Sequence, residues 1–140
     1  MISFFYFREM KIDLTKISYG ELNSKEKENY NYHKVASALA EYGYDSMRLN
    51  NDWNGADFIS VKGDDMIKVQ LKSRFTISEK YIDKNIWIAF VENGIVYMYD
   101  HDLIVKDLTD STRKSRSWSV NKNYSQMPVP KVYIDLMIVL

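Results

Sequence analysis

The fold is decided by the stretch from Asp52 to Arg74, DWNGADFISVKGDDMIKVQLKSR, which reads as two short strands and a tight turn. Within it, Gly63-Asp64 places glycine in the first central position of a two-residue loop, which is the chemistry of a type II′ hairpin turn. Such a loop pairs Lys62 with Asp65, and every further pair follows by counting outward from the turn. The turn therefore predicts the register of both strands.

Three chemically active side chains fall on one side of this predicted hairpin. Counting back along the ladder sets Asp57 opposite Gln70, and directly paired residues have Cβ atoms about 5 Å apart on the same face. Lys72 lies two residues beyond Gln70, so its side chain points to the same side of the sheet. We expect a carboxylate, an amide oxygen and an ammonium group to share one small surface.

The composition of the 140 residues indicates one folded domain, with 46% hydrophobic and 14% aromatic residues. The 19 basic and 19 acidic residues cancel, which argues against coating nucleic acid through bulk charge but leaves a local basic patch open. Cysteine is absent, which excludes disulfides and thiolate metal sites and is typical of a cytoplasmic protein. Only His33 and His101 could be imidazole ligands, so we do not expect a zinc enzyme.

Three segments are distinguished within this single domain of residues 1–140. Residues 1–22 are interpreted as an N-terminal extension. Its apolar run Ile2–Phe7 is far shorter than the ~20 residues of a membrane helix, and it is expected to be either a strand or an extension before a second possible start at Met10. It also lacks the basic leader and cleavage site of a signal peptide, so we expect no association with a membrane. Residues 109–127 are interpreted as a polar, basic loop region. Residues 128–140 are an apolar segment that favours a helix over an edge strand.

The clearest helix is predicted at Asn23–Tyr42. Asn23 can cap it, and Glu26 three residues later completes a capping box. Gly43 would end it in the left-handed conformation. Its buried stripe is predicted to hold Tyr32, Val35, Leu39 and Tyr42.

Glu28 lies one turn before this stripe. A carboxylate on the buried side of a helix is costly unless it is paired or binds a cation, so Glu28 is a candidate for a site. The alternative is a solvated residue near the helix start, which the helix dipole favours.

Five strands are predicted after the helix, at about Asp45–Asn50, Ala56–Lys62, Met66–Phe75, Ile86–Val91 and Ile95–Tyr99. In the third, apolar and polar residues alternate with the period of a strand that buries one face. The fourth is nearly continuous in apolar residues, which is typical of a central strand. Asn93-Gly94 is the strongest hairpin signal in the chain and predicts that the last two strands pair. We expect a charged connection at Thr76–Asn85 and a short helix at His101–Leu108 that packs Leu103, Ile104 and Leu108.

The segment of residues 109–127 interleaves cations with aromatic rings: Arg113, Lys114, Arg116, Trp118, Lys122 and Tyr124. Positive charge beside flat rings suits a phosphate backbone and exposed bases. The alternative is a solvated loop anchored by one tryptophan. Trp53 is interpreted as a cover of the core rather than a base-stacking platform.

The order of the predicted elements resembles that of the PD-(D/E)XK, or restriction-endonuclease-like, nuclease superfamily. A helix is followed by a three-strand meander, which carries an acid and a (D/E/Q)-x-K element, and then by a further strand. GADFIS resembles its PD segment, and VQLKS resembles its (D/E)XK segment. More narrowly, the chain from Leu22 to about Tyr124 is similar to a family of uncharacterised bacterial proteins with a D…QxK variant. The matching segments are LNSKEKENYNYHKVASALAEYGYDSMRLNNDWNGADFIS, VQLKSR and KYIDKNIWIAF.

This resemblance implies an α/β fold with a restriction-endonuclease-like core: an N-terminal helix, then an antiparallel three-strand meander in a mixed sheet with flanking helices. Two positions depart from the superfamily motif, since Ala56 stands in place of proline and Gln70 in place of an acid. Glutamine offers one neutral oxygen where a carboxylate offers a charged pair, so metal binding is expected to be weaker.

The activity implied by the resemblance is Mg²⁺-dependent hydrolysis of phosphodiester bonds in DNA, with Mn²⁺ as a substitute. Asp57 would anchor the metal, and further oxygens would come from Gln70, the Leu71 backbone carbonyl and Glu28, directly or through water. Lys72 would orient the attacking hydroxide and offset charge at the phosphate. Arg74, Lys80 and Lys84 would hold the nucleic-acid backbone, together with the cations and Trp118 of the basic segment.

Other functions remain open. Spacing alone allows Asp57 and Lys72 to be a partly buried ion pair that closes a strand end, and the resemblance favours a site. A catalytically inactive module of the same fold could bind nucleic acid through residues 113–124, or the chain could be a protein-interaction partner in a mobile-element or defence system. Endonucleases of this size often dimerise to cut both strands, which leaves a homodimer open.

Overall fold

The computed structural model describes residues 4–7 and 10–140, with side chains from residue 12 onward. The chain forms two compact units, Met1–Tyr30 and Asn31–Leu140. The first holds the antiparallel strands β1 (Phe4–Phe7) and β2 (Met10–Asp13), the 3₁₀ turn η1 (Tyr19–Glu21) and the first turns of helix α1 (Ser24–Ala40). The strand expected in Ile2–Phe7 is confirmed from Phe4, while residues 2 and 3 lie outside the described residues. None of the described helices is both long and apolar enough to cross a membrane.

Helix α1 begins with the predicted capping box. The Asn23 N–H donates to Glu26 Oε1 at 2.9 Å, and the Glu26 N–H donates to Asn23 Oδ1 at 2.8 Å. Gly43 follows the last helical residue with a φ of +87°, as a left-handed C-terminal residue does. Tyr42 lies beyond the helix end and is 52% exposed, so it does not belong to the buried stripe; Asn31 is buried instead.

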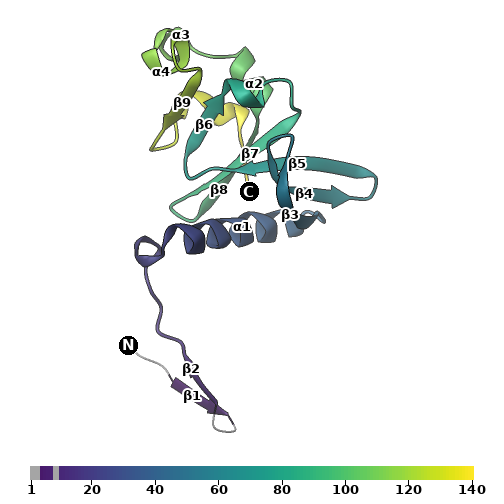
Figure 1. Cartoon of the computed structure of the whole chain (residues 1–140), viewed down its shortest axis with the longest axis vertical. Coiled ribbons are helices and arrows are strands. Elements are labelled where there is room, and N and C mark those ends of the chain that lie inside the picture. Colours follow the sequence, from purple (N-terminus) through teal and green to yellow (C-terminus); the bar gives the residue numbers. More distant parts are fainter. Residues whose placement is uncertain (1–3, 8–9) are drawn as a thin grey trace. The chain divides into compact units, whose positions relative to one another are not determined.

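The second unit is built on a mixed six-stranded sheet with the order β10-β8-β7-β5-β4-β3. Strands β3, β4 and β5 form an antiparallel meander, and β7 runs parallel to β5 (Figure 1). The predicted α/β fold class, a helix followed by a three-strand meander in a mixed sheet with flanking helices, is confirmed. Its strands are β3 (Asp45–Trp53), β4 (Ala56–Lys62), β5 (Asp65–Leu71), β7 (Ile86–Glu92), β8 (Ile95–Asp100) and β10 (Ile138–Val139).

Both predicted hairpin turns are present. Gly63 has a φ of +60° between the paired residues Lys62 and Asp65, and the ladder continues to Phe58 opposite Val69. Asn93-Gly94 has positive φ at both residues, which is the type I′ geometry that suits the twist of the flanking strands.

A third hairpin, at Asn54-Gly55, was not predicted. Asn54 has a φ of 52° and Gly55 a φ of 88°, and Trp53 pairs with Ala56 across the turn. Strand β3 therefore continues past Asn50 to Trp53, and its pairing register with β4 shifts between Arg48 and Trp53.

Separate cores cover the two faces of the sheet. The residues of α1 from Asn31 onward pack on one face, where Val35 and Leu39 join a cluster with Phe58 and Val69. The other face carries a larger cluster that includes Ile88 and Tyr99. Besides strands of the sheet, this cluster draws residues from β6 (Phe75–Ser78), η2 (Glu79–Tyr81), α2 (His101–Lys106), α4 (Arg116–Ser119), β9 (Asn123–Gln126) and η3 (Lys131–Leu136). Figure 1 shows β6, β9, α2 and α4 together on that side, with α3 (Asp110–Lys114) next to α4.

Several expected boundaries were wrong, because segments far apart in the chain pair with each other. The strand predicted at Met66–Phe75 ends at Leu71, and Phe75 begins β6, which pairs with β9 in a separate two-stranded sheet. This pairing also orders residues 109–127, which form α3, α4 and β9 rather than a loop. The C-terminal segment contains both predicted alternatives, since η3 is helical and β10 is an edge strand on β8.

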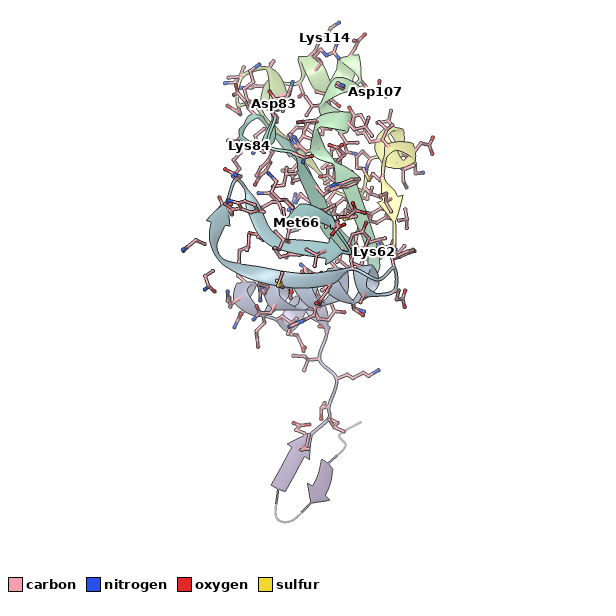
Figure 2. All side chains as sticks on the ribbon, turned by 90° about the vertical axis from the view of Figure 1, so that its right-hand side faces the viewer. Lys62, Met66, Asp83, Lys84, Asp107 and Lys114 are labelled. Carbon is pink, nitrogen blue, oxygen red and sulfur yellow. The ribbon has the colours of Figure 1, made fainter. Side chains whose placement is uncertain are left out.

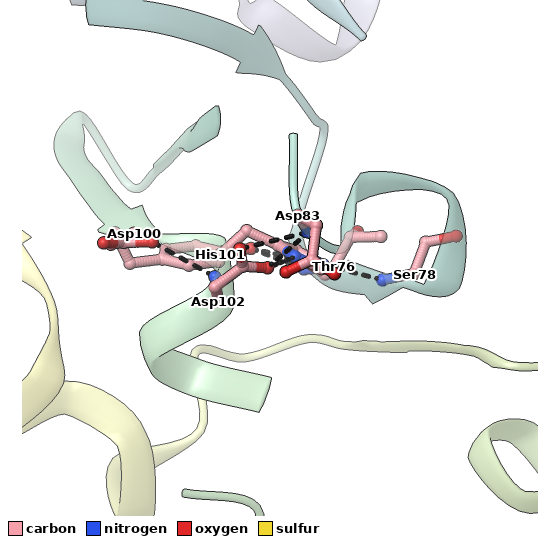
Figure 3. A network of polar contacts seen from close by, with 7 residues as sticks. Thr76, Ser78, Asp83, Asp100, His101 and Asp102 are labelled. Carbon is pink, nitrogen blue, oxygen red and sulfur yellow. Dashed lines mark hydrogen bonds and ion pairs between the residues drawn. The ribbon is translucent and has the colours of Figure 1, made fainter. Parts of the chain in front are cut away.

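Two buried polar side chains attach β6 to the main sheet. The Tyr99 hydroxyl at the end of β8 accepts from the Thr76 N–H at 2.9 Å and donates to the Thr76 carbonyl at 2.6 Å. The His101 Nε2 atom accepts from the Ser78 N–H at 3.0 Å (Figure 3). Side chains thus satisfy backbone groups of β6 at the edge where it has no strand partner among the described residues.

His101 belongs to a wider polar network at the start of α2. Its Nδ1 lies 3.5 Å from Asp102 Oδ1, and Asp102 in turn accepts from the Asp83 N–H, while Asp100 accepts from the Asp102 N–H (Figure 3). The predicted helix is confirmed and buries Ile104, with Leu108 buried just beyond it, but Leu103 is exposed.

Candidate functional site

A pocket of about 440 Å³ brings together five of the predicted site residues. Asp57 comes from the start of β4, Gln70 from the end of β5, and Lys72 follows directly after β5. Lys80 lies in η2 and Lys84 in the turn before β7, where Figure 2 shows it beside Asp83. The pocket is lined by Asp52, Asn54, Gly55, Asp57, Gln70, Lys72, Lys80, Tyr81 and Lys84.

Asp57 and Gln70 face the side of the sheet that carries the larger core. The ladder that pairs Phe58 with Val69 places both of these in the α1-side core, so their neighbours Asp57 and Gln70 point the other way. Gln70 pairs with Ile88 of β7, which belongs to the larger cluster. The register predicted from the turn therefore holds.

The Asp57 carboxylate is held at the strand end by a backbone donor. Its Oδ2 atom accepts from the Leu71 N–H at 2.9 Å. This bond crosses from β4 to β5 and fixes the carboxylate beside the residue that follows Gln70. The bond orients the carboxylate, and carboxylate oxygens are ligands of hard cations.

The Gln70 amide is also held in place, but in a way the sequence did not predict. Its Nε2 atom donates to the Leu71 carbonyl at 3.2 Å. The carbonyl expected to face a metal is therefore an acceptor for the neighbouring amide, and Leu71 is not among the lining residues. Among residues 12–140, no hydrogen bond to the Gln70 amide oxygen is found, so this oxygen is the group that Gln70 can offer to a ligand.

Tyr81 forms a wall of the pocket and supports two of its cations. The Lys72 Nζ atom lies 5.3 Å from the centre of the Tyr81 ring, and the Lys80 Nζ atom lies 5.1 Å from it. Burial raises the pKa of the Tyr81 hydroxyl; Lys80 opposes this effect, while Asp57 and Asp52 add to it. The hydroxyl is therefore protonated at neutral pH and close enough to both carboxylates to sense their charge.

Gly55 is required beside Tyr81. A Cβ atom at this position would lie 3.1 Å from Cδ1 of Tyr81 and 3.2 Å from Cδ1 of Ile86, and its φ of +88° is rare for any other residue. The Asn54-Gly55 turn thus brings the β3–β4 hairpin tip against the ring and carries Asp52 and Asn54 to the pocket. The Asn-Gly pair is the signal that could have predicted these lining residues.

Other predicted site residues do not line this pocket. Glu28 belongs to the first unit, where its side chain is 54% exposed and Oε2 lies 4.0 Å from Lys25 Nζ, in agreement with a solvated residue near the helix start. Arg74 lines a neighbouring pocket. Arg113 donates to the Leu108 carbonyl at 3.2 Å. The remaining cations of the basic segment, Lys114, Arg116 and Lys122, are exposed, and Lys114 lies at the opposite end of the unit from Lys62 and Met66 of the β4–β5 hairpin (Figure 2).

The two tryptophans had different outcomes, and only the interpretation of Trp53 was wrong. Trp118 is only 9% exposed and belongs to the larger core, which agrees with the alternative of one anchoring tryptophan and excludes stacking on a base. Trp53 is 47% exposed at the hairpin tip and does not cover the core. The Lys68 Nζ atom lies 5.7 Å from the Trp53 ring centre and also donates to the Lys84 carbonyl, which places this exposed ring near the pocket.

The charges of the pocket suit a phosphate together with a cation. Three lysines and two aspartates line it, so anionic and cationic groups are both within reach of one ligand. In the described part of the chain there is no group of three or more His, Asp or Glu side chains arranged to hold a metal ion. The donors present are carboxylate and amide oxygens, which are the ligands of Mg²⁺ and Mn²⁺ rather than of zinc.

Comparison with solved structures finds the bacterial homing endonuclease I-Ssp6803I, at 13% sequence identity and a TM-score of 0.46, covering 69% of this chain and 85% of that one. No family model and no curated protein matches the chain.

Proposed function

We propose that the protein is a metal-dependent nuclease that hydrolyses phosphodiester bonds of DNA in the pocket around Asp57 and Lys72. The observation that carries this proposal is the presence of both residues in one open pocket of about 440 Å³, together with Asp52, Lys80 and Lys84. Hydrolysis needs charge neutralised at phosphorus and an activated water. A pocket with cations and carboxylates on facing elements can supply both.

Mg²⁺ fits the donors of this pocket. It prefers oxygen ligands, and it commonly uses one or two carboxylates, with its other ligands coming from water and substrate phosphate. Asp57 and Asp52 would hold it, and the Gln70 amide oxygen is the third candidate. When bound, such a metal acts as a Lewis acid and makes a bound water easier to deprotonate.

The lysines bind and orient the phosphate. Lys72 follows directly after the end of β5. A hydrogen bond of 2.9 Å from its N–H to the Ala89 carbonyl of β7 holds its backbone in place. Its ammonium offsets charge on the phosphate oxygens in the transition state, where a preorganised donor is most effective. Lys80 and Lys84 approach from η2 and the following turn, and they attract the DNA backbone.

The test is cleavage of a supercoiled plasmid by the full chain with Mg²⁺ or Mn²⁺. We expect nicked or linear product from the wild type, and rates about 10²–10³-fold lower from Lys72→Ala, as for loss of one transition-state donor. Asp57→Asn should lose activity as well. Lys106→Ala is the matched control, since this exposed lysine on α2 does not line the pocket.

Circular dichroism should show that all variants remain folded. Equal cleavage rates for the wild type and Lys72→Ala would overturn the assigned site.

A second function is favoured by one observation, the Gln70 amide that replaces the usual acid and donates to the Leu71 carbonyl. This arrangement weakens the metal site while keeping the cations, so it suits a module that binds nucleic acid without cutting it. It predicts salt-sensitive DNA binding with no cleavage under either metal. Cleavage that depends on Lys72 would exclude it.

A further inference from the structure

A second pocket, of about 320 Å³, lies next to the first and has a different charge. It is lined by Lys72, Ser73, Arg74, Thr76, Ser78, Lys80, Asn123 and Ser125. Its charged side chains are all cations, and no carboxylate lines it. Lys72 and Lys80 line both pockets, so they form the boundary between them.

The polar face of the β6–β9 sheet forms much of this second pocket. Thr76 pairs with Ser125, and Ser78 pairs with Asn123, so two rows of short polar side chains face the same way. The alternate residues of β6, Phe75 and Ile77, belong to the larger core. This strict alternation leaves hydroxyl and amide groups on the side that opens to the pocket.

The backbone behind this face is held rigidly. Tyr99 and His101 satisfy the Thr76 and Ser78 backbone groups on the edge of β6 away from β9. The Thr76 hydroxyl donates to the Arg74 carbonyl at 3.0 Å, which fixes the turn that carries Arg74. A backbone held in this way keeps the wall of the pocket in place, so that less conformational entropy is lost when the pocket binds an anion.

We propose that the second pocket binds the phosphate next to the one held at Asp57 and Lys72, so that a DNA strand crosses from the first pocket over Lys72 and Lys80 onto the β6–β9 sheet. Arg74 neutralises this second phosphate, and Asn123 and Ser125 donate hydrogen bonds to it. Phosphate oxygens accept from such groups throughout protein–DNA interfaces. This assignment rests on the proposed function, because it names the path of the same substrate.

Loss of the cation Arg74 and loss of the neutral donors Asn123 and Ser125 should affect the salt dependence of binding differently. Each cation that neutralises a phosphate contributes about −0.9 to the slope of log K against log salt concentration for duplex DNA, and about −0.7 for a single strand. Arg74→Ala should therefore weaken binding about tenfold. It should also make the slope less negative by about 0.9 for duplex DNA and about 0.7 for a single strand. Asn123→Ala and Ser125→Ala should weaken binding and leave the slope unchanged, because they release no counterion.

The experiment is fluorescence anisotropy with a labelled 20-mer duplex and its single strand, in EDTA, over a range of salt concentrations. EDTA removes divalent metal, so the readout does not depend on cleavage. Lys106→Ala is the matched control, since this exposed lysine on α2 lines neither pocket. The proposal is supported if the slope changes for Arg74→Ala and not for Lys106→Ala.

Three results would overturn the proposal: no salt-dependent binding of either DNA by the wild type, an unchanged slope for Arg74→Ala, or a loss of slope confined to Lys106→Ala. These outcomes are separate from those of the proposed function. If Lys72-dependent cleavage persists while Arg74 has no effect on the slope, the site of hydrolysis holds and the second phosphate position fails. If Arg74→Ala changes the slope but the wild type does not cleave DNA, the second phosphate position holds and the site of hydrolysis fails.

Discussion

Replacing Tyr99 by phenylalanine tests whether one hydroxyl group holds β6 against the main sheet. The substitution removes a single oxygen atom from a side chain that is fully buried. That oxygen makes two hydrogen bonds to the same residue, accepting from the Thr76 N–H and donating to the Thr76 carbonyl. Burial raises the pKa of Tyr99, so the hydroxyl keeps its proton at neutral pH and can donate.

The expected loss follows from the groups left behind. Thr76 is itself buried, so its N–H and carbonyl cannot simply turn to water. A buried polar group without a partner costs about 1–3 kcal/mol, and partial relaxation of the strand lowers the total. We expect Tyr99→Phe to reduce the free energy of unfolding by about 2–3 kcal/mol, which corresponds to a fall of about 7–10 °C in Tm for a chain of this size.

Urea denaturation monitored by tryptophan fluorescence measures this loss, because Trp118 lies in the core beside β6. Amide hydrogen exchange at Thr76 should accelerate in the same variant, which separates a local effect from a general one. Tyr97→Phe is the matched control: Tyr97 lies on the same strand and is also buried, but among residues 12–140 no hydrogen bond to its hydroxyl is found. We expect it to change stability by less than about 0.5 kcal/mol. Equal stability of Tyr99→Phe and wild type, or an equal loss in Tyr97→Phe, would refute the reasoning.

Two further predictions concern the pH dependence of stability and the exposed tryptophan. Burial lowers the pKa of His101 below its usual 6.5, while Asp102 and Asp100 oppose this effect. Below pH 6.5 the unfolded chain therefore binds a proton at this residue that the folded chain does not. As the pH decreases, His101 reduces the free energy of unfolding by at most about 1.4 kcal/mol per pH unit. The urea midpoints at pH 7.5 and pH 5.5 should differ less in His101→Gln than in the wild type. The control His33→Gln, at an exposed position, should keep the wild-type difference. An unchanged difference in His101→Gln would contradict the role of His101 in the pH dependence of stability. Trp53 is exposed near the pocket, so Trp53→Ala should weaken binding of single-stranded DNA about tenfold, as loss of one stacked base does, while Trp53→Phe should retain most of the affinity. Anisotropy titrations of the three proteins decide this, and equal affinity of Trp53→Ala and wild type would exclude stacking.

Part of the candidate site could be predicted from the sequence because it depends on neighbours in the chain. Glycine at position 63 allows the turn, and the turn sets the register that places Asp57 beside Gln70. The capping box of α1 and the Asn93-Gly94 hairpin are local in the same sense. In each case the determining residues lie within a few positions of the feature, so a short stretch of chain contains the whole cause.

The rest depended on contacts between distant segments. Local pattern cannot show that β6 pairs with β9, which turned a predicted basic loop into the wall of a second pocket. Nor can it show which tryptophan is covered: Trp118 is buried within the larger core, whereas Trp53, at the β3–β4 hairpin tip, is not among the residues of that core and stays exposed.

The sequence by itself determined the helix, the meander and the register that gathers a carboxylate, an amide and an ammonium group on one face. Only the tertiary structure decided that Tyr81 would wall that face, that Lys80 and Lys84 would reach it while Arg74 lines the adjoining pocket, and that Leu71 would turn its carbonyl to Gln70. The physical reason is that turns and caps are stabilised within a few residues, whereas pockets form where separate elements meet.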